Sequence, residues 1–215
     1  MLGTAEEKQK SFNQLQLLTN DELYMDSETG VVTITNSGTM NTDKELTKGT
    51  KMISDLITND EYNCKITRDY IENEGCKIRY YDSSSVIIMN TWDEIGGNWR
   101  YCVYNGKGGD TFQTHGDVAY ILLGHELIHA IHHMNDTLSD MSKTVYRYIG
   151  SELVADIREN LSVSEEYNTV GLAHIVEYSN FQNGHTYRRF YLPMPGALTE
   201  NALRTEQKLT LRTAY

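Results

Sequence analysis

The segment Gly124-His125-Glu126-Leu127-Ile128-His129-Ala130 constrains the fold of this chain more than any other. It has the pattern H-E-x-x-H and lies in an apolar run that begins at Ala119 and ends at Ile131. On a helix, residues four apart share one face, so two imidazoles at this spacing can bind one zinc ion. Glu126 then lies beside the metal, where it can act as a general base toward water. The competing interpretation is a buried helix with two hydrogen-bonded histidines. That interpretation does not explain Glu126, because a carboxylate in an apolar helix is costly to bury.

The composition limits the classes of partner. A formal net charge of −11 repels nucleic acid and anionic lipid, so we expect no nucleic-acid partner. No apolar run approaches the ~20 residues of a membrane span, and the first residues do not resemble a secretory signal peptide. The three cysteines form no C-x-x-C pair. We expect reduced thiols, with a disulfide between Cys64 and Cys76 as the alternative.

Apolar periodicity and turn residues predict strands in the first half of the chain. A polar amphipathic helix is expected at 4–19, with Phe12, Leu15 and Leu18 on one side. It is followed by a turn at 26–30, a strand at 31–35 and a short helix at 52–57. Three strands are expected at 63–68, 77–81 and 85–90, and a fourth at 99–104.

From Gly116 onward the pattern predicts helices. Asp117 is a suitable N-cap for the helix with the H-E-x-x-H segment, and Thr199 for the last one. Others are expected at 146–160, where Ile149, Leu153, Ile157 and Leu161 would form an apolar stripe, and from Glu165. The fold class is therefore α+β, with a small N-terminal mixed or antiparallel sheet packed on a long active-site helix. We expect a single domain over 1–215, sheet-rich at 1–110 and helical at 111–215.

A third metal ligand is needed, because a catalytic zinc usually has three from the protein. His115, His174 and His185 lack a supporting pattern, and we expect His132 to support the site or to pack beside it. A carboxylate is then expected, from Glu152 or from the Glu165-Glu166 pair. Glu152 also fits a solvated helix face, and the acidic pair also fits a first helix turn that complements the dipole. Spacing alone leaves both candidates open.

The C-terminal segment Arg212-Thr213-Ala214-Tyr215 places a guanidinium and a phenol three residues apart. Such donors could stabilise the oxyanion that forms during carbonyl hydrolysis. The competing interpretation is a frayed basic tail.

Three segments together resemble known metalloproteases. They are His-Glu-Leu-Ile-His-Ala at 125–130, Glu-Glu-Tyr-Asn-Thr-Val-Gly at 165–171 and Arg-Thr-Ala-Tyr at 212–215. Their order resembles that in clostridial neurotoxin light chains. The size and the segment Thr199-Glu200-Asn201-Ala202-Leu203-Arg204 are closer to the NleD-like family of effector zinc endopeptidases, and similar domains end Rhs-type polymorphic toxins. Asn168 replaces the arginine of the neurotoxin element.

The resemblance implies a zincin-like gluzincin that binds Zn²⁺ through His125, His129 and Glu166. Glu126 would be the base and then the acid, and Glu165 would orient a histidine. Arg212 and Tyr215 would face the substrate carbonyl. The implied protein is a bacterial effector or toxin domain, secreted or translocated into a target cell, where it cleaves a specific protein in the cytoplasm. A cognate immunity protein or secretion machinery would be further partners.

The expected substrate is a protein bound in extended conformation, with 85–90 as the candidate edge strand that pairs with it. Two other classes compete with the peptidase. One is a metal-free acidic module that binds a protein without catalysis, and the other is a metal hydrolase that acts on a non-peptide bond.

Overall fold

The computed structural model describes residues 1–70, 76–91, 100–104, 110–114, 119–139, 142, 144–149, 151–157, 163–179 and 184–213, with only the backbone at 100–104, 110–114 and 149. Over these residues the fold is α+β, as expected. The helices are α1 (Ala5–Gln16), α2 (Thr47–Thr58), α4 (Ala119–Met134), α5 (Val163–Val170) and α6 (Glu200–Glu206). The strands are β1 (Glu22–Met25), β2 (Val32–Asn36), β3 (Asn63–Asp69), β4 (Lys77–Tyr81), β5 (Ser84–Asn90), β6 (Arg100–Tyr104), β7 (Asp110–Thr114), β8 (Thr144–Ile149), β9 (Glu152–Ile157), β10 (His174–Ser179) and β11 (Thr186–Tyr191).

The predicted N-terminal helix is confirmed, and local signals explain its start. The Thr4 hydroxyl accepts from the Glu7 amide, and the Glu7 carboxylate accepts from the Thr4 amide at 2.8 Å, which forms a capping box. Leu15 and Leu18 enter the main core. The predicted strand at 31–35 corresponds to β2, which pairs with β1, a strand that the sequence pattern did not reveal.

The three predicted strands at 63–90 are confirmed, and they form one sheet in the order β3-β5-β4. β5 pairs in parallel with β3 and antiparallel with β4. The expectation that 85–90 is an edge strand is therefore wrong. The run Val86-Ile87-Ile88-Met89 is apolar on both faces and largely buried, which is typical of a central strand. β4 is an edge of this sheet among the described strands, and it contacts α4.

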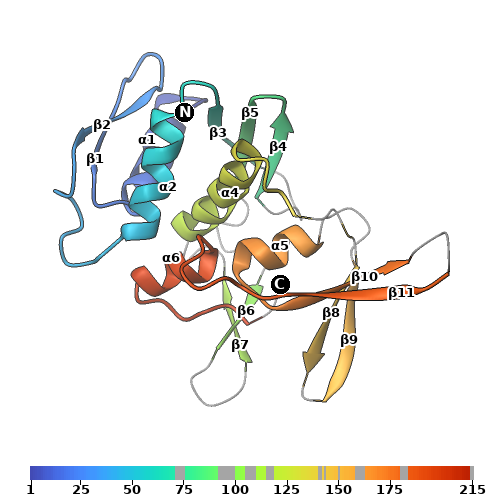
Figure 1. The fold of residues 1–215 in the computed structure, drawn as a ribbon. Coiled ribbons are helices and arrows are strands. Elements are labelled where there is room, and N and C mark those ends of the chain that lie inside the picture. Colours follow the sequence, from blue (N-terminus) through green and yellow to red (C-terminus); the bar gives the residue numbers. More distant parts are fainter. Residues whose placement is uncertain are drawn as a thin grey trace.

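Helix α4 lies at the centre of the molecule (Figure 1). All its residues from Ile121 to Ile131 are buried. It contacts α1, α2, β4 and β5 of the N-terminal half and α5 and α6 of the C-terminal half. Gly124 permits close approach of α6, because a Cβ at this position would lie 2.7 Å from Leu203 Cδ1. The residues of the H-E-x-x-H segment are thus held by packing on both sides.

The C-terminal half differs from the expectation of helices alone. The predicted helix at 146–160 is wrong, because 144–149 and 152–157 form the antiparallel pair β8–β9 with Ile149 opposite Glu152. Aromatic and β-branched residues in 144–149 favour a strand, and the dipeptide Gly150-Ser151 is typical of a turn. These strands join β10 and β11 in a sheet of order β11-β10-β8-β9. Val145 and Val176 of this sheet pack with Val163 and Tyr167 of α5.

The structure also bears on the strand at 99–104 and on the cysteines. The predicted strand at 99–104 corresponds to β6, which pairs with β7 and not with the N-terminal sheet. Cys64 and Cys76 are free thiols, as expected, so the alternative disulfide is wrong. The proposed N-cap Asp117 lies outside the described residues. No described helix is long and apolar enough to cross a membrane.

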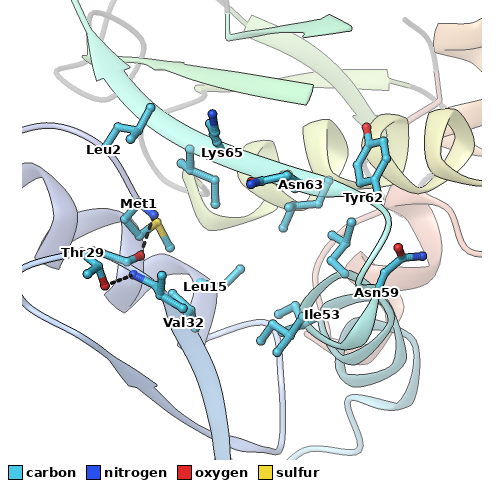
Figure 2. Close-up of a pocket in the computed structure, with 17 residues that line it drawn as sticks. Met1, Leu2, Leu15, Thr29, Val32, Ile53, Asn59, Tyr62, Asn63 and Lys65 are labelled. Atoms are coloured by element: carbon cyan, nitrogen blue, oxygen red, sulfur yellow. Dashed lines mark hydrogen bonds between the residues drawn. The ribbon is translucent and has the colours of Figure 1, made fainter. Parts of the chain in front are cut away.

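A cavity of about 360 Å³ lies between α1, α2, β2 and β3 (Figure 2). Its apolar walls include Leu15, Val32, Ile53 and Ile66, and α4 contributes Leu127. None of the candidate site residues lines it. The chemistry of the H-E-x-x-H segment is therefore located elsewhere, where α4 faces α5.

Candidate metal centre

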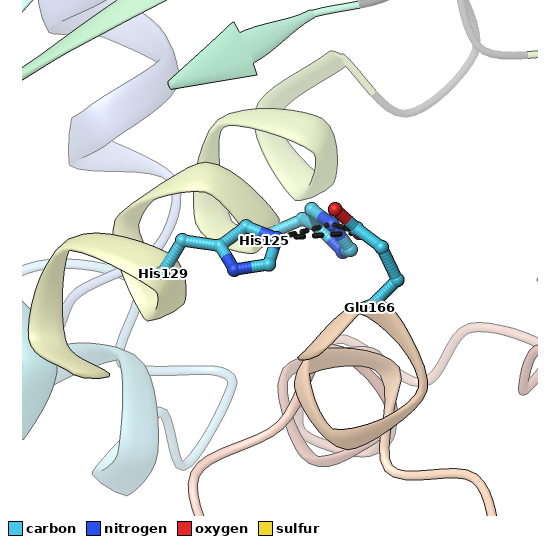
Figure 3. Close-up of side chains that lie close together, drawn as sticks. All are labelled: His125, His129 and Glu166. Carbon is cyan, nitrogen blue, oxygen red and sulfur yellow. Dashed lines mark hydrogen bonds and ion pairs between the residues drawn. The ribbon is translucent and has the colours of Figure 1, made fainter. Parts of the chain in front are cut away.

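Helices α4 and α5 bring the candidate ligands together (Figure 3). His125 and His129 lie one turn apart on α4, and both are buried. Glu166 projects from the first turn of α5, where the helix dipole favours acidic residues. Glu166 Oε2 lies 2.9 Å from His125 Nε2 and 3.3 Å from His129 Nε2, and the two Nε2 atoms are 3.1 Å apart. Three ligand atoms from two helices thus converge on one point.

Two other carboxylates determine which histidine nitrogens face that point. Glu200 Oε2 lies 3.0 Å from His125 Nδ1, and Glu165 Oε1 lies 3.1 Å from His129 Nδ1. An ionised carboxylate only accepts hydrogen bonds, so both Nδ1 atoms donate. In neutral rings the Nε2 lone pairs are then directed at each other and at Glu166. A cation between them would relieve this repulsion, so the donor set fits a metal ion and includes the nitrogen and oxygen ligands that zinc prefers.

Glu165 is itself held by several donors. His132 Nδ1 lies 2.7 Å from its Oε1, and Thr169 Oγ1 donates to the same oxygen at 3.2 Å. The backbone amide of Ser139 donates to Oε2 at 2.7 Å. His132, which the sequence analysis expected near the site, therefore contacts Glu165 and not the point where the ligand atoms converge. The carboxylate of Glu165, fixed by these donors, in turn orients the ring of His129.

Glu200 is the residue of this centre to which the sequence analysis assigned no role. It is completely buried at the start of α6, next to the N-cap Thr199. Arg204 Nε donates to Oε1 at 2.7 Å, and Arg212 Nη1 donates to Oε2 at 2.8 Å. The E-x-x-x-R spacing on a capped helix was the available signal, since it places both side chains on one face.

The tail interpretation of Arg212 is wrong, because this side chain is buried against Glu200. Its backbone is also held, since Arg212 N donates to Asn201 Oδ1 at 2.8 Å. The other residue of that pair, Tyr215, lies outside the described residues. Arg212 is therefore connected to His125 through one carboxylate.

The remaining candidates lie away from the centre. Glu152 is exposed at the start of β9, which removes the helix on which its role as alternative ligand depended. His174 is buried in β10, where its Nε2 lies 2.9 Å from Ser164 Oγ. His185 is exposed, and His115 lies outside the described residues.

The charges of the centre influence one another strongly. Burial by itself would raise the pKa of Glu200, but Arg212, the hydrogen bond to His125 and Arg204 hold it well below its ordinary value. Burial would likewise raise the pKa of Glu166, but the two histidines hold it far below its usual range. Burial would lower the pKa of His129, yet Glu166 and Glu165 raise it well above its ordinary value.

Glu126 differs from the other carboxylates of the centre. It is buried, and burial raises its pKa, while His125 and His129 only partly oppose this shift. The four carboxylates of Glu126, Glu165, Glu166 and Glu200 outnumber the guanidinium groups of Arg204 and Arg212. Protons on His125 and His129 offset this charge in the metal-free centre, and a bound cation could take their place.

Comparison with known protein families shows the family to which this chain belongs. The M91 peptidase family, described as an effector protein, matches residues 16–215. The chain belongs to the M91 family of effector peptidases. The match spans every element of the centre, from α4 to Arg212, and it confirms the resemblance to NleD-like effectors. No curated protein and no solved structure matches the chain significantly. Membership of M91 implies a peptidase with a protein substrate.

Proposed function

We propose that this M91 peptidase is a zinc-dependent endopeptidase with a zincin-like active site. The single observation that supports this most is the convergence of two imidazole nitrogens and one carboxylate oxygen beside Glu126. In this proposal His125, His129 and Glu166 hold the zinc ion. Bound zinc would polarise the scissile carbonyl and lower the pKa of water.

Glu126 would move the proton. It takes a proton from the attacking water and later gives it to the leaving amine. A carboxylate suits both roles when its pKa is near the working pH, and burial raises the pKa of Glu126 in that direction. Glu126 is adjacent to a ligand in sequence but is not one of the three convergent donors. These features support its role as general base.

Arg212 and Tyr215 remain the proposed donors to the oxyanion. For Arg212, the contact with Glu200 supports a location close to His125. The same contact supports a second role, because Arg212 neutralises the carboxylate that orients a zinc ligand. Loss of the guanidinium would weaken metal binding if Arg212 supports Glu200, and would leave metal affinity unchanged if Arg212 acts only on the oxyanion.

The substrate would be a specific protein in a target cell, bound in extended conformation. Effector membership supports delivery into host cells, where the peptidase would act in the cytoplasm. β4 replaces β5 as the candidate edge strand, because it is a sheet edge among the described strands and contacts α4. Secretion machinery or a cognate immunity protein would be further partners.

The test is N-terminal peptide mapping of target cells that express the wild type or Glu126→Ala. We expect new protein N-termini with the wild type alone. Elemental analysis of protein purified without chelator should give one zinc per chain. Metal-free protein that gains no zinc would favour the non-catalytic binding module. Bound metal without new N-termini would favour hydrolysis of a non-peptide bond.

A further inference from the structure

The segment Gly184–Gly196, which comprises β11 and the loop before α6, is exposed at every position except Tyr191. We call it the β11 segment. Leu192 is 73% exposed and Met194 is 77% exposed, the highest values among the large hydrophobic residues that the structure describes. Apolar side chains this exposed and this close together are unusual on a soluble surface and often mark an interaction site.

The backbone of the loop part of this segment is conformationally restricted. Pro193 and Pro195 are the two prolines of the chain, and each restricts its own backbone. The Ala197 amide donates to the Met194 carbonyl at 3.0 Å, and Gly196 has φ +78°. Proline followed by a glycine with positive φ is typical of a type II turn. The backbone at Leu192 and Met194 therefore has few conformations to lose, which reduces the backbone entropy lost on binding.

Both ends of the segment are anchored to the elements that build the metal centre. β11 pairs with β10 from Thr186 to Tyr191, and β10 follows α5, which carries Glu166. At the other end Thr199 caps α6, which carries Glu200, and a Cβ on Gly171 at the end of α5 would lie 2.9 Å from the Thr199 hydroxyl. In Figure 1 the chain runs from β11 past α5 to α6, so a partner on this segment would lie near the two helices that carry Glu166 and Glu200.

The charge of the segment is opposite to that of the chain. Between Glu177 and Glu200 the sequence has no Asp or Glu, the longest such stretch in a chain of net charge −11. Arg188 and Arg189 lie in the middle of it, on β11. Arg188 is paired with Glu177 at 3.0 Å, while the guanidinium of Arg189 lies 5.2 Å from the ring centre of Tyr191. The exposed segment therefore combines positive charge with apolar side chains.

We propose that the β11 segment is a docking site for the protein substrate. Leu192 and Met194 would enter an apolar groove on the substrate, and Arg189, which lies on the opposite face of β11 from the Arg188–Glu177 pair, would face carboxylates on its rim. The proposal rests on the proposed peptidase function and identifies the class of substrate, a folded protein with an acidic-rimmed apolar groove outside the cleaved bond. A membrane surface fits less well, because the net charge of −11 repels anionic lipid and two arginines attract it only weakly.

The experiment compares two substrates once peptide mapping has identified the cleaved protein. One is that protein in its folded form, and the other is a short peptide that spans the cleaved bond. For Leu192→Ala/Met194→Ala and for Arg189→Glu, we expect kcat/KM to fall at least about tenfold on the folded protein and to stay unchanged on the peptide. Arg189→Lys should retain most of the rate. Leu17→Ala, at another exposed leucine, is the control.

A second measurement tests docking on the β11 segment independently of the proposed peptidase function. A photo-crosslinking amino acid is placed at 192, or at 17 as control, in the Glu126→Gln chain in target cells. We expect crosslinks from 192 to the cleaved protein, lost with Arg189→Glu. If the wild type cleaves no protein, the proposed peptidase function is wrong. Crosslinks from position 192 that are lost with Arg189→Glu would still show that the segment binds a protein, and their absence would show that it does not. Equal cleavage by all variants, absence of crosslinks, or binding of phosphatidylserine vesicles through Leu192 would each overturn the docking proposal.

Discussion

Glu200 and His125 are joined by a hydrogen bond of 3.0 Å between Oε2 and Nδ1, although α6 and α4 are far apart in the sequence. Because Glu200 also binds Arg204 and Arg212, the last helix and the residues after it complete the environment of a proposed zinc ligand. Folding of the C-terminal segment and metal binding should therefore be coupled.

Glu200→Gln should weaken zinc binding by about 10–100-fold, because the charge that orients His125 and raises its basicity is lost. It should also destabilise the fold by about 3–5 kcal/mol, since Arg204 and Arg212 lose a buried partner. Zinc competition titration and urea unfolding measure the two effects. Glu206→Gln on the same helix is the control, because that carboxylate contacts the amides of Lys48 and Gly49 instead. Unchanged zinc affinity in Glu200→Gln would contradict the proposed coupling between the C-terminal segment and metal binding.

The same residue predicts a pH dependence of stability. The pKa of Glu200 in the folded chain lies well below its ordinary value of 4.5. Its ionised form therefore stabilises the fold above pH about 4.5, and this contribution is lost as the pH falls through the lower folded pKa. Urea unfolding of metal-free protein between pH 7 and 3 should show a smaller acid-induced loss in Glu200→Gln than in the wild type. Parallel curves would contradict the prediction.

Glu166→Gln should strongly reduce zinc affinity, and Glu152→Gln should leave it almost unchanged. The Glu166 carboxylate lies within 3.3 Å of both Nε2 atoms, while Glu152 is exposed on β9. A chromophoric chelator that competes for zinc distinguishes the variants. The reverse order of affinities would show that Glu152 on β9, and not Glu166 on α5, is the third ligand.

Glu126→Ala should keep the fold and the bound zinc but lose at least about 10²–10⁴-fold in cleavage rate, as expected for a general base. Circular dichroism and elemental analysis check the first part, and cleavage of the mapped protein substrate checks the second. An active Glu126→Ala protein would end the proposed proton transfer.

Arg212→Ala separates the two proposed roles of this guanidinium. As a donor to the oxyanion it acts mainly in the transition state, so kcat should fall by about 10²–10³ in zinc-saturated protein, whereas loss of the orienting role would weaken zinc binding in a competition titration. Because Arg212 is buried against Glu200, we also expect a lower melting temperature, unlike for an exposed tail residue. Arg212→Lys should restore stability more than kcat, since an ammonium lacks the planar fork. A normal kcat in Arg212→Ala would leave only the structural role.

Gly49→Ala tests the packing that holds α2 on the N-terminal core. A Cβ at Gly49 would lie 1.9 Å from the Leu18 carbonyl oxygen, a backbone atom that cannot move aside easily. In an open helix this change would stabilise by about 0.8–1.0 kcal/mol, but here we expect destabilisation of about 1–3 kcal/mol. Lys51→Ala, on the exposed side of the same helix, should change stability by less than about 0.5 kcal/mol. Equal stability of the two variants in urea would contradict the clash.

Local patterns in the sequence were sufficient where a structure depends on neighbouring residues. The amphipathic pattern at 4–19 predicted α1, and Thr199 predicted the start of α6, because a cap bonds to amides two or three residues away. The spacing of His125 and His129 predicted a shared helix face for the same reason. The hairpin-like spacing of short runs at 63–90 predicted three strands, but not their order, because pairing depends on distant partners.

Tertiary structure decided what local spacing left open. Apolar residues at 146–160 fit a helical stripe, yet β8 and β9 form an antiparallel pair, because β8 also pairs with β10 and packs on α5. Spacing could not choose between Glu152 and Glu166, and only the packing of α5 on α4 brings one of them to the histidines. Glu200 had no signal stronger than one E-x-x-x-R pair. The sequence by itself therefore determined the two histidines and the catalytic chemistry that they suggest, while long-range packing decided which carboxylates surround them.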